Sequence, residues 1–225
     1  MKVAIRGIKT YKLSNAISIA LKSASEFLYG YFKFHNVDKL VTVYGSARLK
    51  PGSDYYELGV EVGKKLALNG IGVMTGGGPG IMEAANKGAK EAGGCSYGCR
   101  INIATEKSQN KYLDCDLKFK YFFTRKYMLA RFSIGFIALP GGFGTMDELF
   151  EMLTLVCTEK IERFPIVLIG VDYWKPLIEY LDKTFVKNGV ITAEELKLMY
   201  LTDSIDEAIN YIQSKFSEIP DEKKQ

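Results

Sequence analysis

The sequence predicts an α/β protein with a doubly wound, Rossmann-like parallel sheet, helices on both faces and an N-terminal helical extension. Short β-branched and apolar runs alternate with segments of roughly 10–15 residues that have helical periodicity. Two glycine-rich clusters each join such a run to a helix. Loops of this kind lie at the carboxyl edge of a parallel sheet, where ligands bind.

Size and composition agree with this fold class. The chain has 225 residues, of which 47% are hydrophobic and 25% charged, as in an ordinary globular protein. A chain of this length buries about 70% of its unfolded surface, so it needs no disulfide bonds to fold. No apolar run approaches the ~18 residues that span a bilayer. We therefore expect no membrane partner.

The first element is a helix over residues 13–34. Its apolar stripe runs through Ile17, Leu21, Phe27 and Phe32, and Ser14 is placed to cap it. We expect this helix to pack on the body of the protein or on a second subunit.

The main domain follows as alternating strands and helices. Its strands are predicted at 40–44, 71–75, 98–103, 117–121, 134–139 and 165–169. Its helices are predicted at 54–69, 81–92, 123–132, 145–159, 173–187, 193–199 and 204–217. The expected organisation is a basic tail and helix over 1–37, a nucleotide-binding Rossmann-like domain over 38–217 and a polar tail over 218–225.

Charge argues against a nucleic-acid partner. The net charge of +4 equals the contribution of Lys2, Arg6, Lys9 and Lys12, so the rest of the chain is neutral overall. A nucleic-acid binder more often carries basic stripes across its folded surface. We interpret the basic start as solvated, with a membrane or nucleic-acid arm as the alternative.

The cysteines and the single histidine exclude several chemistries. Without a recognisable secretory signal, Cys95, Cys99, Cys115 and Cys157 are expected to be reduced thiols in the cytoplasm. Their spacing does not suit a zinc site, and no metal is expected. His35 alone cannot complete a Ser-His-Asp or Cys-His arrangement.

The first glycine cluster runs from Thr75 to Gly80. Glycines allow a backbone to approach a ligand closely, and free amides at a helix start attract anions. The cluster matches neither G-x-G-x-x-G nor a Walker lysine motif, which argues against a dinucleotide or a nucleoside triphosphate. The alternative is a tight strand–helix turn. The candidate anion-binding glycines are Gly76, Gly77, Gly78 and Gly80.

The second cluster, residues 140–145, also joins a strand to a helix. Thr145 and Glu148 have the spacing of a capping box, in which Glu148 would bond the cap amide. A phosphate would compete for the same amides. Two such helix starts in one sheet favour a monophosphate site more than either does alone. Its candidate residues are Gly141, Gly142, Gly144 and Thr145.

A basic pair lies between the two clusters, after several aromatic residues. Arg125 and Lys126 open a predicted helix, from which they could clamp a phosphate or a substrate carboxylate. The alternative interpretation is a solvated helix face beside core aromatics.

Four segments together resemble the LOG ("Lonely guy") family. They are GSAR at 45–48, TGGGPGIMEAANKGA at 75–89, FFTRKYM at 122–128 and LPGGFGTMDELFEMLT at 139–154. The family signature P-G-G-x-G-T-x-x-E is complete at 140–148, and the resemblance extends from about Val41 to Ile212. Family members are nucleoside 5′-monophosphate phosphoribohydrolases, many acting on cytokinin ribotides. Many relatives are labelled "possible lysine decarboxylase", but this sequence has no recognisable pyridoxal motif.

The resemblance implies roles for particular residues. Arg125 and Glu148 match the catalytic pair, and the glycine loop that ends at Thr145 matches the phosphate-binding loop. Gly45, Ser46 and the loop 76–80 match positions that line the nucleotide pocket. Lys126 and Glu83 lie in motif segments near the site. The family generally works as a homodimer, with larger homo-oligomers in some branches, and the site lies near the subunit interface. The expected chemistry requires no metal or redox cofactor.

One stretch departs from the longer branch of the family. Ile103-Ala104 replaces the usual Leu-Pro, and Lys107 replaces the usual Gln, whereas Glu106 and Asn110 are retained. Glu106 and Asn110 are therefore candidate substrate contacts, and the preferred base is left open.

The expected function is hydrolysis of the N-glycosidic bond of AMP or an N6-modified AMP, which gives free base and ribose 5-phosphate. The alternative is a non-catalytic carrier of a phosphorylated ligand, such as a nucleotide or molybdenum cofactor. An interaction protein acting through helix 13–34 is the weakest alternative, because it leaves both glycine loops unexplained.

Overall fold

The computed structural model describes residues 13–37, 39–101, 110–162 and 164–218. The chain divides into two compact units, residues 1–36 and residues 37–225. The smaller unit contains α1 (Leu13–Phe34), with the bounds that the sequence predicts. At its end, the His35 ring stacks on Tyr31 with centroids 5.6 Å apart, and His35 Nδ1 lies 3.1 Å from the Phe32 carbonyl oxygen.

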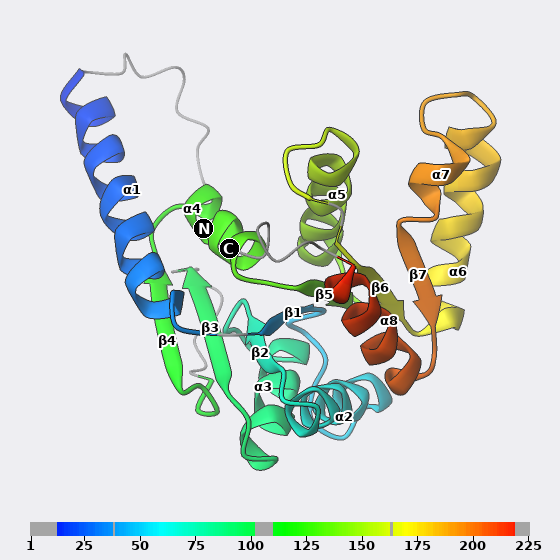
Figure 1. The fold of residues 1–225 in the computed structure, drawn as a ribbon, viewed down its shortest axis with the longest axis horizontal. Helices are drawn as coiled ribbons and strands as arrows, with labels where there is room; N and C mark the ends of the chain where they lie inside the picture. Colours follow the sequence, from blue (N-terminus) through cyan, green and yellow to red (C-terminus); the bar gives the residue numbers. More distant parts are fainter. Residues whose placement is uncertain (1–12, 38, 102–109, 163, 219–225) are drawn as a thin grey trace, which may run out of the picture. The chain divides into compact units, whose positions relative to one another are not determined.

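The larger unit is built on a seven-stranded parallel sheet with the strand order β4-β3-β2-β1-β5-β6-β7 (Figure 1). This order confirms the predicted doubly wound sheet. The strands are β1 (Leu40–Tyr44), β2 (Gly72–Thr75), β3 (Ser96–Ile101), β4 (Cys115–Phe119), β5 (Gly135–Ala138), β6 (Ile166–Ile169) and β7 (Met199–Thr202).

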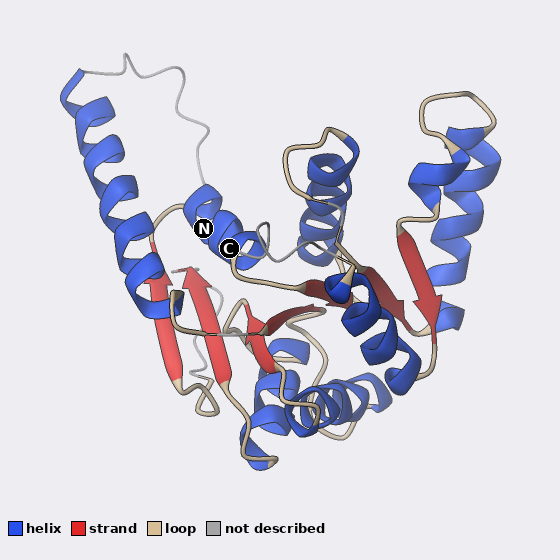
Figure 2. Ribbon diagram, in the orientation of Figure 1, coloured by secondary structure: helices blue, strands red, loops and turns tan. Residues whose placement is uncertain are grey.

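Helices cover both faces of this sheet (Figure 2). One face carries α2, α3 and α8, and the other carries α4, α5 and α6. The main helices are α2 (Asp54–Leu68), α3 (Ile81–Glu91), α4 (Phe122–Arg131), α5 (Phe143–Cys157), α6 (Val171–Tyr180) and α8 (Ile205–Ser217). The strands between the two layers are apolar and buried, as β1, β2, β5 and β6 show along their whole length.

Three local predictions were wrong. The predicted helix 173–187 is α6 followed by a π-helical segment, Leu181–Val186. The predicted helix 193–199 is the single turn α7 (Ala193–Leu196), and β7 begins at Met199. Two of the four residues of β7 are half-buried, so β7 lacks the wholly buried apolar run of the other four-residue strands, β2, β5 and β6.

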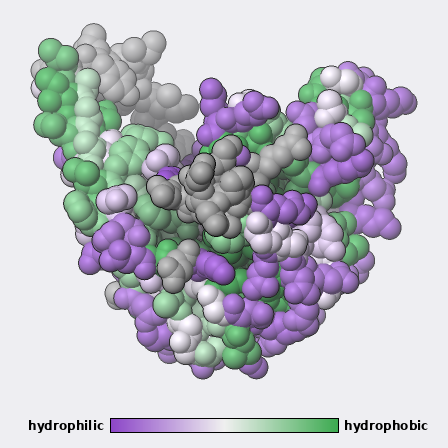
Figure 3. Space-filling view, viewed as in Figure 1, coloured by the Kyte–Doolittle hydropathy of each residue, from purple (hydrophilic) through white to green (hydrophobic). Residues whose placement is uncertain are grey.

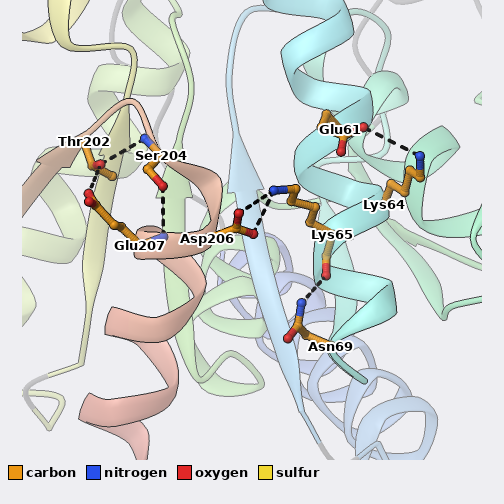
Figure 4. Close-up of polar contacts among 8 residues, drawn as sticks. All are labelled: Glu61, Lys64, Lys65, Asn69, Thr202, Ser204, Asp206 and Glu207. Atoms are coloured by element: carbon orange, nitrogen blue, oxygen red, sulfur yellow. Dashed lines mark hydrogen bonds and ion pairs between the residues drawn. The ribbon is translucent and has the colours of Figure 1, made fainter.

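The last helix, α8, is fixed at its start by side chains (Figure 4). Ser204 Oγ accepts from the Glu207 amide at 3.2 Å, and Thr202 Oγ1 donates to Glu207 Oε2 at 2.7 Å. Lys65 of α2 pairs with Asp206 at 2.7 Å, which ties the two helices together. On the face seen in Figure 3, the surface over α2 and α8 is mostly hydrophilic.

The strand order reverses between β1 and β5, and the loops that follow these two strands are hydrogen-bonded to each other. The Ser46 amide donates to the Pro140 carbonyl at 3.1 Å, and the Ile81 amide donates to the Ser46 carbonyl at 3.0 Å. Three loops therefore meet at the carboxyl edge of the sheet, the location at which doubly wound proteins bind ligands. None of the helices in the described part of the chain has the length and apolarity that a bilayer crossing requires.

Candidate active site

A cavity of about 590 Å³ opens at this edge, which is within the usual size range of ligand sites. Its walls come from the end of β1, the loops after β1 and β5, and the starts of α3, α4, α5 and α6. The predicted residues that line it are Gly45, Ser46, Arg125, Gly141, Gly142, Gly144, Thr145 and Glu148. Residues from 45 to 148 thus converge on one cavity.

The start of α5 forms one wall. The helix begins at Phe143, with Gly142 as its N-cap and no side-chain cap, so the capping-box interpretation of Thr145 and Glu148 is wrong. Thr145 lies inside the first turn, whose amides have no acceptor within the helix. Gly141 is required here, because a Cβ at this position would overlap the Thr145 hydroxyl. These features leave the helix start suited to an anion.

The glycine loop 76–80 does not line the cavity, but it contacts residues that do. Gly76, Gly77, Gly78 and Gly80 are not among the lining residues. A Cβ on Gly76 would overlap the Arg125 guanidinium, and one on Gly80, which has a φ of +70°, would overlap the Ser46 carbonyl oxygen. The loop therefore lets Arg125 and the segment after β1 approach closely.

Arg125 and Glu148, which both line the cavity, form a buried ion pair. Arg125 Nη1 lies 3.3 Å from Glu148 Oε1, and the two side chains are only 11% and 7% exposed. Arg125 Nε donates to the Cys99 carbonyl at 2.8 Å, which orients the guanidinium from β3. The two charged side chains expected to carry the chemistry therefore come from different helices, α4 and α5, and contact each other.

Glu148 retains capacity for a ligand. Its second oxygen, Oε2, is buried and has no hydrogen-bond partner among the described residues. Burial raises the pKa of Glu148, while the positive charges of Arg125 and Lys126 oppose that rise. A buried carboxylate oxygen without a donor is unfavourable, so this atom is well placed to accept a hydrogen bond from a ligand.

Lys126 lies beside the pair and outside the main cavity. Its Nζ is 2.8 Å from Asp147 Oδ2 and 2.9 Å from Glu151 Oε2. Burial lowers the pKa of Lys126, but these two carboxylates more than compensate, so the pKa is raised overall. Lys126 lines a second cavity of about 580 Å³ along α5.

The remaining predicted residues lie away from the cavity lining. Glu83 Oε1 accepts from the Tyr56 hydroxyl at 3.4 Å. Asn110 is buried and donates to Asn86 Oδ1 at 3.0 Å. This bond ties the end of the stretch that differs from the family to α3. Glu106 lies outside the described residues.

The predicted site residues left out nine residues that line the cavity. Three of them, Tyr44, Ala47 and Arg48, lie next to the Gly45-Ser46 pair in the sequence, and this proximity was the available signal. Tyr173 donates its hydroxyl to the Gly141 carbonyl at 2.8 Å, a contact that no local pattern indicates. The missed lining residues are Tyr44, Ala47, Arg48, Met82, Phe122, Phe143, Met146, Asp147 and Tyr173.

The structure gives no indication of a metal centre in the residues that it describes. Within residues 13–37, 39–101, 110–162 and 164–218, no group of three or more His, Cys, Asp or Glu side chains could hold an ion. None of the four cysteines in these ranges forms a disulfide bond.

Sequence comparison identifies relatives that share this site region. A family model described as "Possible lysine decarboxylase" matches residues 82–212. A rice protein named cytokinin riboside 5′-monophosphate phosphoribohydrolase LOG is 30% identical over 158 residues, 69% of this chain and 64% of that one. An Arabidopsis thaliana phosphoribohydrolase of the same description is 31% identical over 68% of this chain and 72% of its own. The chain spans less than two thirds of the length of this rice protein and of a second rice relative, 64% and 66%.

A bacterial relative and solved structures extend the comparison. The phosphoribohydrolase of Rhodococcoides fascians is 27% identical over 78% of this chain and 90% of its own. A molybdenum cofactor carrier protein from Chlamydomonas reinhardtii has the same fold, with a TM-score of 0.58 at 22% identity over 80% of this chain and 99% of that chain. Together, the family model and the relatives show that this chain belongs to the LOG family, whose family model is described as possible lysine decarboxylases.

Proposed function

We propose that this protein hydrolyses the N-glycosidic bond of a nucleoside 5′-monophosphate, AMP or an N6-modified AMP, to free base and ribose 5-phosphate. The observation that carries the proposal is the buried Arg125–Glu148 pair, which lines the same cavity as a glycine-rich helix start. The names of the LOG relatives support the same reaction.

The start of α5 is the proposed phosphate site. The uncapped amides of its first turn offer donors to an anion, and the helix dipole adds to the attraction. Thr145 lines the cavity at the same place. Holding the 5′-phosphate there would fix the ribose over Glu148, which supplies catalysis by orientation.

Glu148 is the proposed catalytic carboxylate. As the base departs, the sugar carbon becomes oxocarbenium-like, and an ionised carboxylate beneath it offsets the growing positive charge. Glu148 Oε2 is the oxygen available for a ribose hydroxyl or a water. A water that donates to Oε2 would lose its proton to Glu148 as its oxygen bonds to the sugar carbon. The base would leave with the electron pair of the broken C–N bond and take up a proton from solvent. Arg125 would orient Glu148 and the substrate through its bonds to Glu148 and Cys99.

A direct assay tests the proposal. Purified protein is incubated with AMP and with N6-isopentenyl-AMP, and the products are separated by chromatography. Release of free base with ribose 5-phosphate is expected, and the ratio of the two rates gives the base preference. Glu148→Gln should fold normally and bind AMP, but its turnover should fall by about 10²–10⁴-fold.

The matched control is Glu179→Gln. Glu179 is exposed on α6, where it pairs only with Lys183 at 3.0 Å among the contacts described, so its loss should leave turnover unchanged. Full turnover in Glu148→Gln would remove Glu148 from the mechanism. If the wild type binds AMP without releasing base, the result would instead favour a carrier. This alternative is compatible with the fold, which molybdenum cofactor carriers share.

We also propose that the protein is a homodimer. Exposed aromatic side chains gather on α4 and α5 around both cavities, where Phe143 lines the two cavities and is 96% exposed. Phe122 lines the first cavity and Phe150 the second, so each shares a cavity with Phe143. A second copy of this face would cover these rings at the mouth of the site.

A further inference from the structure

Tyr44 brings to the cavity a polar group that the proposed mechanism does not use. It is the last residue of β1, the central strand, and lines the same cavity as Glu148. Only 5% of the residue is exposed. Its ring stacks on Phe136 with centroids 5.3 Å apart, which restricts the direction of the phenol.

The Tyr44 hydroxyl and Glu148 Oε2 are both buried, and neither has a hydrogen-bond partner among the described residues. Buried polar side chains normally have partners, so two such atoms in one cavity wall need an explanation. The atoms are complementary, because a phenol can donate and an ionised carboxylate can only accept. Burial raises the pKa of Tyr44 and the charge of Glu148 raises it further, so the phenol keeps its proton at neutral pH.

We propose that Tyr44 and Glu148 together bind one hydroxyl group, which accepts a hydrogen bond from Tyr44 and donates one to Glu148 Oε2. A hydroxyl fits because one oxygen both accepts and donates. The inference rests on the proposed function, which supplies two such groups, a ribose hydroxyl and the attacking water. Because Gly45 follows Tyr44 and also lines the cavity, a ribose held there would lie beside the phenol.

The variant Tyr44→Phe removes only the phenolic oxygen. Because that oxygen is unsatisfied without ligand, the melting temperature should stay the same or rise. With AMP, kcat/KM should fall by about 10-fold to 100-fold. The matched control, Tyr200→Phe, alters a tyrosine of β7 that stacks on Tyr211 outside the cavity and should leave both quantities unchanged.

Two analogues identify the source of the hydroxyl. If it belongs to the ribose, Tyr44→Phe should slow the reaction of AMP but have little further effect on whichever of 2′-deoxy-AMP and 3′-deoxy-AMP lacks that hydroxyl. If it belongs to the water, Tyr44→Phe should lower kcat by the same factor for all three nucleotides and leave KM unchanged.

Wild-type kcat and KM in Tyr44→Phe would overturn the inference, as would a loss of activity that is explained by a lower melting temperature. Failure of the proposed function is recognised separately, because the wild type would then release no base. In that case the inference is tested by calorimetry, which compares the affinity of the wild type and of Tyr44→Phe for AMP and its deoxy analogues. Weaker AMP binding in Tyr44→Phe that disappears with one deoxy analogue would support it, and equal binding would overturn it.

Discussion

Lys126 affects the candidate site through charge. Burial has the largest effect on the pKa of Glu148 and raises it. The positive charges of Arg125 and Lys126 lower this pKa, and the negative charges of Glu151 and Asp147 raise it. The net result is a pKa above the usual 4.5. Since the ionised carboxylate is the active form in the proposed mechanism, activity should fall as the pH drops through this raised pKa.

The pH dependence of kcat/KM tests this assignment. Lys126→Met removes a positive charge that favours ionised Glu148. The acid limb of the profile, where kcat/KM falls as the pH drops, should therefore move to higher pH. The control Lys183→Met removes an exposed lysine of the π-helical segment, which pairs with Glu179, and should leave the limb in place. An unmoved limb in Lys126→Met would show that Lys126 does not act on the titrating group.

At the scale of elements, close contact between α2 and α3 depends on two glycines. A Cβ on Gly63 of α2 would overlap the Ala85 carbonyl oxygen, and one on Gly88 of α3 would overlap the Val60 carbonyl oxygen. The two backbones therefore approach each other more closely than side chains would allow. This packing supports α3, whose N-terminus follows the loop behind Arg125.

Gly63→Ala should therefore destabilise the protein, although alanine favours helices. Overpacking costs about 1–3 kcal/mol, and the gain in helix propensity returns at most about 1 kcal/mol of it. Unfolding in urea, monitored by circular dichroism, should give a lower midpoint. Glu61→Ala, on an exposed part of the same helix, should change stability by less than about 0.5 kcal/mol. A higher midpoint in Gly63→Ala would contradict the close contact.

At the scale of the whole molecule, the proposed homodimer is tested by mass in solution. Phe150→Asp places a charge within the aromatic surface of α5, so light scattering after gel filtration should show the monomer mass. Tyr180→Asp changes an exposed aromatic residue on α6 and should leave the dimer mass unchanged. A monomeric wild type would overturn the proposal.

The fold was predictable because its signals are local. Six of the seven strands and the main helices follow from apolar periodicity and glycine stops, which depend on residues a few positions apart. β7 escaped because two of its four residues are half-buried, whereas β2, β5 and β6, which have the same length, are buried throughout and read as apolar runs. The π-helical segment after α6 likewise has no local pattern that distinguishes it from a continuing helix.

The sequence by itself determined the sheet class, the two glycine loops and the identity of the Arg125 and Glu148 candidates. Only the tertiary structure decided that Glu148 pairs with Arg125, 23 residues away, and does not cap its own helix. It also brought Tyr44 into the same cavity wall and placed the loop 76–80 behind Arg125. The physical reason is that backbone conformation depends on neighbouring residues, whereas side-chain contacts depend on how distant segments pack.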